Sequence, residues 1–291
     1  MRAQPIEIGF DRLRKPQIPK GLSIRYLLTR EQVRVKTPST SPAIPILTAW
    51  NTSKVPHGFL GRLGGVSTGP YESLNLAYWV GDNPAQVDEN WRRLREVIGA
   101  ETPIARCHQV HGKKVRIVTR DNISERPEGD GMVTADSGVL LAVASADCVP
   151  ILMVDARCKI VGAIHAGWRG VIAGIAQEGV RAMGRLGAKP HEIRAALGPS
   201  IGQCCFEVDE ELGRLFAHKV AGSDRHSRAG RLGKSHLDLR AIVTDQLMRA
   251  GLPRESIMGV GPCTKCANDR YFSRRANASS GLQLSFIGIS A

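Results

Sequence analysis

The segment from residue 139 to residue 175 places the strongest limits on the fold. It reads VLLAVASADCVPILMVDARCKIVGAIHAGWRGVIAGI. Short apolar runs bounded by turn residues are typical of buried strands, and there are three here, at residues 139–145, 151–154 and 160–164. Cys148 follows the first run and His165 follows the third. A thiol and an imidazole therefore stand at the ends of rigid strands beside open turns, where sites are commonly built.

A second histidine, His111, lies upstream in the sequence QVHG. Two imidazoles and one thiolate form a donor set for zinc that leaves a fourth position open for water or substrate. The alternative is that Cys148, His165 and His111 are ordinary residues, because cysteines are often buried in cores. The residue types alone leave both interpretations open.

Six segments carry a resemblance to a known family. They are RLGGVS from Arg62, SLNL from Ser73, QVHG from Gln109, ADCVP from Ala146, HAGWRG from His165 and GPSI from Gly198. In this order they resemble the laccase-domain (YfiH-like) family of bacterial proteins, long labelled polyphenol oxidases and later reassigned as purine nucleoside phosphorylases. The resemblance covers about residues 45 to 290.

The resemblance implies a catalytic zinc held by His111, Cys148 and His165. It also implies phosphorolysis of adenosine and inosine to free base and ribose 1-phosphate, activity on methylthioadenosine, and some adenosine deamination. Asp147, next to Cys148, is either a general acid/base of this site or a residue that orients its zinc ligands, or it is a structural carboxylate bonded to backbone.

Further residues are candidates for binding substrate or phosphate. The glycine-rich loop at residues 62–76 brings Arg62, Ser67 and Asn75, which could reach hydroxyls or phosphate; the alternative is a tight connection that needs glycine. Arg169 lies in a bend from which we expect a helix after Gly170, and a helix N-terminus favours anions. The alternative for Arg169 is a surface ion pair.

One position departs from the family pattern. The family has a threonine–glycine–arginine sequence near the C-terminus, where this chain has Ser280, Gly281 and Leu282. Any anion contact of the missing arginine would have to come from Arg274 or Arg275.

The order of the expected elements predicts an α+β protein. Strands and helices intermix without regular βαβ alternation, so we expect one domain, residues 45–291, as a sandwich of mixed β-sheets flanked by helices. One helix should begin at Pro84, with residues 87, 91, 94, 97 and 98 inward. Residues 222–235 read as a basic, mobile loop, and residues 1–44 as a basic, proline-containing N-terminal extension.

The charge and the cysteines bear on partners and compartment. The net charge of +13 favours anionic partners, but no nucleic-acid motif accompanies it, so we expect purine nucleosides and phosphate rather than nucleic acid or a membrane. The seven cysteines lack the dense spacing of a disulfide scaffold, which predicts reduced thiols in a cytoplasmic protein. Of these, the adjacent Cys204 and Cys205 are interpreted as packing residues. The CxxC of Cys263 and Cys266 could be a redox pair or half of a structural zinc site, but no second CxxC follows, and the resemblance implies no metal role here and therefore favours packing.

Three rival functions remain. A copper-dependent polyphenol oxidase would need many histidines for several coppers, and the chain has eight, without a paired HxH pattern. A cysteine hydrolase would use Cys148 as nucleophile and His111 or His165 as base. A nucleic-acid binder rests on the positive charge alone.

Overall fold

The computed structural model describes residues 43–157 and 159–290, so the expected N-terminal extension lies almost wholly outside the described residues. Two large mixed sheets carry the fold. The six-stranded sheet runs in the order β13 (Ile257–Gly259), β9 (Arg194–Leu197), β7 (Val149–Asp155), β8 (Ile160–Ala166), β5 (Gly131–Thr134), β4 (Val115–Ile117). The five-stranded sheet runs in the order β1 (Ile46–Leu47), β2 (His57–Leu60), β14 (Gln283–Gly288), β6 (Leu140–Ser145), β3 (Ile104–Ala105).

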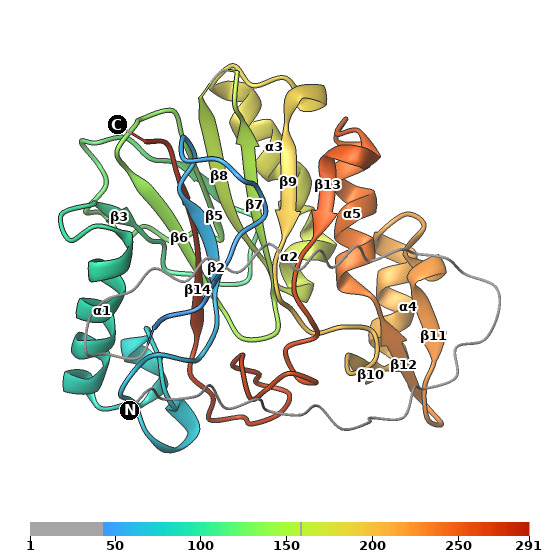
Figure 1. Cartoon of the computed structure of the whole chain (residues 1–291). Coiled ribbons are helices and arrows are strands. Elements are labelled where there is room, and N and C mark those ends of the chain that lie inside the picture. The colour runs from blue at the N-terminus through green and yellow to red at the C-terminus, as the bar shows by residue number, and fades with distance from the viewer. Residues whose placement is uncertain (1–42, 158, 291) are drawn as a thin grey trace, which may run out of the picture. The chain divides into compact units, whose positions relative to one another are not determined.

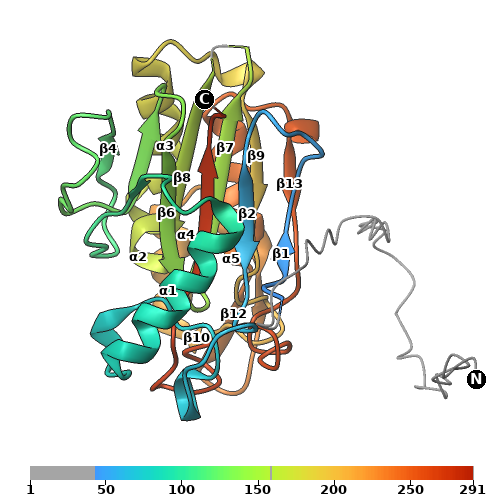
Figure 2. The same cartoon turned by 60° about the vertical axis from the view of Figure 1, so that its left-hand side comes forward.

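Helices cover the outer faces of both sheets (Figure 1). Helix α1 (Pro84–Ile98) packs on the five-stranded sheet, and Figure 2 brings this helix forward. Helices α3 (Ile175–Arg185) and α5 (Leu239–Arg249) pack on the six-stranded sheet. The expected α+β sandwich of mixed sheets flanked by helices is therefore confirmed, with four layers in the order helix, sheet, sheet, helix.

Burial on both faces explains why β7 is a continuous apolar run. Ile151 and Met153 point into the core beneath α3 and α5. Leu152 and Val154 belong to the core between the two sheets. Because successive side chains of a strand point to opposite faces, the side chains of a strand in the middle of this sandwich enter one core or the other, and polar residues are found only near its ends.

Two elements differ from expectation next to the predicted site. His165 lies within β8 rather than after it, and the following helix, α2 (Trp168–Ala173), begins before Gly170. This helix has only six residues because Gly174 takes the left-handed conformation (φ 84°) and separates it from α3. The dipole of so short a helix is too small to support the anion site that we expected at its N-terminus.

The segment at residues 222–235, expected to be a loop, contains regular structure. Strands β11 (Ser227–Ala229) and β12 (Lys234–Leu237) pair with each other, and β12 also pairs with β10 (Glu207–Asp209). Between β10 and β11 lies α4 (Glu210–Lys219). The polar composition of this segment concealed a three-stranded sheet, in which Val208 of β10 and Leu237 of β12 are buried in the core. No helix among the described residues is both long and apolar enough to cross a membrane.

Helix α1 begins and ends as its sequence predicts. The side chain of Asn83 accepts a hydrogen bond from the backbone N–H of Ala85, and Gly99, at φ 107°, follows the last turn. Trp91 and Leu94 are buried as expected, but Val97, expected inward, is 41% exposed. The buried stripe is therefore narrower than the pattern suggested.

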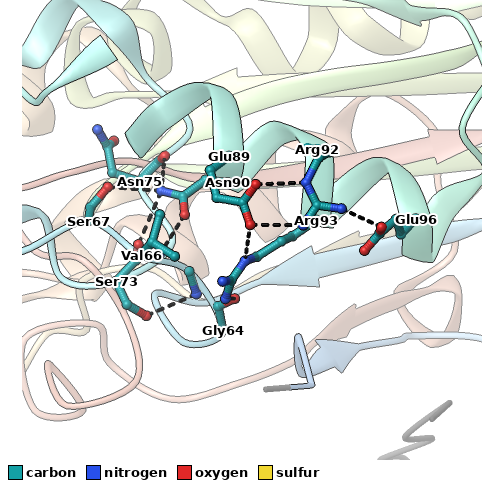
Figure 3. Close-up of polar contacts among 11 residues, drawn as sticks. Gly64, Val66, Ser67, Ser73, Asn75, Glu89, Asn90, Arg92, Arg93 and Glu96 are labelled. Carbon is teal, nitrogen blue, oxygen red and sulfur yellow. Dashed lines mark hydrogen bonds and ion pairs between the residues drawn. The ribbon is translucent and has the colours of Figure 1, made fainter. Parts of the chain in front are cut away.

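A buried polar residue of α1, Asn90, fixes the glycine-rich loop to this helix (Figure 3). Its Nδ2 donates to Ser67 Oγ at 2.9 Å and to the carbonyl oxygens of Ser73 and Asn75 at 3.1 and 2.9 Å. Its Oδ1 accepts from the N–H of Val66 at 2.8 Å. One fully buried amide thus pairs with polar groups from three stretches of the loop.

Asn90→Ala is expected to lower the free energy of unfolding by roughly 2–4 kcal/mol, because several buried polar groups lose their partner. Urea unfolding measures this loss. The matched control is Arg92→Ala on the exposed face of α1, where Arg92 pairs with Glu89 and Glu96. Exposed ion pairs contribute little, so this variant should unfold close to the wild type. Equal losses in both variants would contradict the role given to Asn90.

Candidate active site

The structure brings together the three residues expected to bind metal. His111 lies in the loop before β4, Cys148 in the turn between β6 and β7, and His165 in β8. One donor atom from each lies within 4.8 Å of the other two, and the two imidazole rings meet edge to face at 4.9 Å. His108, three residues before His111, is outside this group. Among the described residues it instead forms a β-bridge with Glu128.

Pairing between β7 and β8 explains how Cys148 meets His165. These strands run antiparallel with Pro150 opposite His165 and Val149 opposite Ala166. Cys148 directly precedes β7, and His165 lies near the end of β8. The start of β7 and the end of β8 are paired at the same end of the sheet, so strand pairing alone brings Cys148 next to His165.

Burial across the trio is graded. His165 is 3% exposed, Cys148 is half-buried and His111 is exposed. The group therefore opens to solvent on the side of His111. A ligand or water could reach an ion there without any rearrangement of the two sheets.

Gly167 has to be a glycine at this site. A Cβ atom built on it would stand 2.7 Å from Cδ2 of His111 and 3.1 Å from Sγ of Cys148. Both side chains belong to the trio, so neither can move aside without spoiling the donor geometry. The glycine after the HA of HAGWRG thus allows the backbone to approach the trio closely.

Asp130 is a functional candidate that sequence reasoning missed. Its carboxylate is fully buried and accepts a hydrogen bond from Nδ1 of His165 at 2.9 Å. It also accepts from the backbone N–H groups of Val110, His111 and Gly112 at 3.2, 2.9 and 2.7 Å. One carboxylate therefore orients His165 and holds the His111 loop. The sequence showed Asp130 only as the start of a turn before Gly131.

Hydrogen bonds to charged groups set the ionisation of this cluster. Burial raises the pKa of Asp130, but the bond to His165 and those from the backbone N–H groups outweigh burial and lower it. Burial also raises the pKa of Cys148, but His165 and His111 together lower it to about 6. Burial lowers the pKa of His165, whereas Cys148 and Asp130 raise it to about 9. The lowered pKa favours the thiolate form of Cys148, which is the form that binds metals.

The His111 loop is further fixed by Gln109. Its side-chain amide exchanges two hydrogen bonds of 2.8 Å with the backbone of Ala144 in β6. His111 itself has φ 61°, a left-handed conformation that is uncommon for histidine. Strain of this kind persists where surrounding bonds impose it, and Asp130 and Gln109 supply those bonds.

Asp147 lies beside the trio with both carboxylate oxygens bonded. Oδ1 accepts from the hydroxyl of Thr264 at 2.6 Å, and Oδ2 accepts from the backbone N–H of Arg275 at 2.7 Å. Like His111, Asp147 has a positive φ, at 91°. These contacts connect the turn that carries Cys148 to the C-terminal segment, a connection that no spacing in the sequence indicated.

The candidate substrate residues of the glycine-rich loop are placed differently from one another. Ser67 and Asn75 are buried, and both bond to Asp82 Oδ2, at 2.6 and 2.9 Å. The side chains described for them therefore hold the loop. Arg62 instead lines a hollow of about 290 Å³ together with Asn268, Ser273, Asn277 and others.

The structure also places the other candidate cations and Leu282. Arg169 is exposed and its guanidinium stacks 4.2 Å from the ring centre of Trp168. Arg275 donates to the carbonyl oxygens of Cys205 and Glu207 at 3.2 and 2.7 Å. Leu282, where the family has arginine, packs against the core beneath α1.

Fold and trio together define a mixed-sheet sandwich in which three residues that could hold a metal ion meet at the ends of β7 and β8. The chain belongs to the family described as multi-copper polyphenol oxidoreductase laccase, whose model matches residues 56–290.

Relatives and solved structures agree with this assignment. A purine nucleoside phosphorylase of Deinococcus radiodurans is 40% identical over 251 residues, 86% of this chain and 95% of the relative. A protein named adenosine deaminase, from an unknown prokaryotic organism, is 36% identical over 72% of this chain and 85% of its own length. The crystal structure of YlmD from Geobacillus stearothermophilus matches with a TM-score of 0.81 at 33% identity, covering 88% of this chain and 99% of that chain. The names of these relatives are those of enzymes acting on purine nucleosides.

Proposed function

We propose that the protein is a zinc-dependent purine nucleoside phosphorylase. Its substrates would be adenosine, inosine and methylthioadenosine, its products free base and a ribose 1-phosphate, with adenosine deamination as a side activity. The observation that carries the proposal is the trio of His111, Cys148 and His165 with the Asp130 carboxylate behind it. The names of the relatives supply the substrate class.

The donor set fits zinc. Two imidazoles and a thiolate leave one position for water or substrate. Nδ1 of His165 faces Asp130, which leaves Nε2 for the ion, and a carboxylate behind a ligating imidazole is the usual partner for such a ligand. A zinc ion bound there would polarise a substrate oxygen or lower the pKa of its water to about 7.

The chain's own residues suggest how phosphate and nucleoside are held. The hollow lined by Arg62 is walled on one side by Ser273 and Asn277. That segment reaches the turn carrying Cys148 through the Arg275–Asp147 hydrogen bond. We therefore assign Arg62 and Arg169 to phosphate, and Asp147 to positioning of the Cys148 turn. Ser67 and Asn75 would act by holding the loop from which Arg62 projects.

The direct test is incubation with adenosine and with inosine, each with and without phosphate, followed by identification of the products. Phosphorolysis predicts adenine or hypoxanthine together with ribose 1-phosphate, formed only when phosphate is present. Deamination predicts inosine from adenosine in either condition. No turnover of either nucleoside by zinc-loaded protein would reject the proposal.

Arg169→Ala should raise the phosphate concentration needed for phosphorolysis by roughly ten- to a hundred-fold, the effect of losing one charge-assisted contact. Deamination consumes water instead of phosphate and should be spared. Phosphate titration with inosine, run beside phosphate-free adenosine deamination, measures both. Arg181→Ala is the control, since Arg181 on α3 pairs with Glu178 at the surface. Equal loss of both activities in Arg169→Ala would assign this arginine to the nucleoside or the fold.

A second candidate, a cysteine hydrolase, is favoured by one observation. The thiol of Cys148, with its lowered pKa, lies next to the imidazole of His165, whose pKa is raised, and such a pair could serve as nucleophile and acid/base. Chelator treatment separates the two functions. A zinc enzyme loses activity and regains it with added zinc, whereas a cysteine hydrolase is indifferent to chelators and is inactivated by alkylation of Cys148.

The description of the family names a multi-copper enzyme, but the candidate metal ligands of this chain do not fit several copper ions. The groups of described residues that could hold a metal are the trio and a set of four cysteines. Neither group contains the many imidazoles that several copper ions would need.

We also propose that the protein acts in the cytoplasm, which fits the free thiols of its described cysteines.

A further inference from the structure

Four cysteines from distant parts of the sequence meet at one edge of the six-stranded sheet. Cys204 and Cys205 follow β9, and Cys263 and Cys266 follow β13. These strands are parallel neighbours, so the chain leaves both at the same edge (Figure 1). The four sulfur atoms all lie within 4.8 Å of one another, and we call this group the cysteine cluster.

The sulfur spacing in the cysteine cluster matches the ligands of one ion. Sγ of Cys266 lies 3.6 Å from Sγ of Cys204 and 3.4 Å from Sγ of Cys205. Disulfide bonding would bring two sulfurs to about 2.05 Å. A tetrahedral zinc with Zn–S bonds of about 2.3 Å separates its sulfur ligands by about 3.8 Å.

The backbone around the cluster allows its two segments to approach each other closely. A Cβ on Gly202 would lie 3.2 Å from Cβ of Cys263 and 3.3 Å from Sγ of Cys204. The absence of a side chain at residue 202 therefore lets the two cysteine-bearing segments come together.

Packing, the role expected from the sequence, does not account for the cluster. Cys204 and Cys266 are exposed, and cysteines that serve only as small apolar residues are usually buried. We propose that the cysteine cluster is a second metal site, a structural Zn²⁺ site with four thiolate ligands. The exposed side gives the ion a path of entry. Two cations lie in the same segments, Lys265 within the CxxC and Arg275 bonded to the carbonyl oxygen of Cys205, and would offset the negative charge of four thiolates.

The second site would act on the first through one hydrogen bond. Thr264 lies inside the CxxC, and its hydroxyl donates to Asp147, the neighbour of Cys148. Its backbone N–H donates to the carbonyl oxygen of Ser200 at 3.1 Å. An ion that fixes Cys263 and Cys266 therefore also fixes Thr264, and with it the turn carrying Cys148. This inference stands whatever reaction the trio catalyses.

The test uses the full chain with the trio disabled, so that only the second site can retain metal. Cys148→Ser protein, purified from zinc-supplemented cells and desalted, should hold about one zinc per chain, against about two in the wild type. Adding Cys266→Ser should remove the remaining zinc. Adding Cys107→Ser instead is the matched control, because Cys107 belongs to neither group of donors. It should leave the zinc in place.

A measurement without a cluster variant guards against misfolding. A mercurial thiol reagent should release zinc from the Cys148→Ser protein into a colour indicator, and cobalt bound in its place should show thiolate-to-cobalt charge-transfer absorption. Zinc-free Cys148→Ser protein, or zinc kept after Cys266→Ser, would overturn the proposal. An intact mass showing a disulfide within the cluster of the purified protein would overturn it as well, in favour of a redox pair.

Discussion

Cys148→Ser should abolish metal binding at the trio and nucleoside turnover while leaving the fold intact. A hydroxyl is a poor replacement for a thiolate, which is the softest of the three ligands. Substitution of a residue that hydrogen-bonds to a metal ligand typically lowers metal affinity or activity by about 10- to 100-fold, and loss of a ligand itself should have a larger effect. Serine matches the size of cysteine in a half-buried turn, so the core cannot be the cause of the loss.

Metal analysis, product assay and circular dichroism on the same preparation measure this result. Cys107→Ser is again the control, a half-buried cysteine outside the trio that should keep metal and activity. If Cys148→Ser binds zinc at the trio as the wild type does, Cys148 is not a ligand. Retained zinc with lost turnover would instead favour a nucleophilic role for the thiol.

Asp130→Asn should have the second largest effect, on metal affinity and stability together. An amide cannot replace a carboxylate that accepts from His165 and from three backbone N–H groups at once. We expect metal affinity at the trio to fall about 10- to 100-fold. Weakening these bonds to the part-buried N–H groups should also lower the free energy of unfolding, by about 1–3 kcal/mol in total.

Asp136→Asn is a matched control for Asp130→Asn. The two aspartates flank β5, and Asp136 also accepts a backbone N–H, that of Arg120 at 2.8 Å, but it lies outside the trio. Competition with a chelating indicator gives the affinities, and urea unfolding of chelator-treated protein gives the stabilities. Unchanged metal affinity in Asp130→Asn, with only stability lowered, would reduce Asp130 to a structural role.

Local sequence patterns predicted the buried central strands and selected His111, Cys148 and His165 as candidate metal ligands. The apolar runs that became β6, β7 and β8 are buried on both faces, so their sequences contain little else and are readable without a structure. The resemblance to the laccase-domain family identified these three candidates, because each lies in one of its distinctive motifs. The strands β11 and β12 could not be recognised, since they are short and mostly polar, and only Leu237 of β12 enters the core.

The sequence by itself determined which residues are buried and which motifs carry donors, because both are properties of short segments. Only the tertiary structure decided what lies behind those donors. Asp130 reaches His165 because β5 and β8 pair, and the cysteine cluster forms because β9 and β13 are neighbours. Neighbouring strands bring together residues that are far apart in the chain, and no spacing along the chain encodes that choice of neighbour.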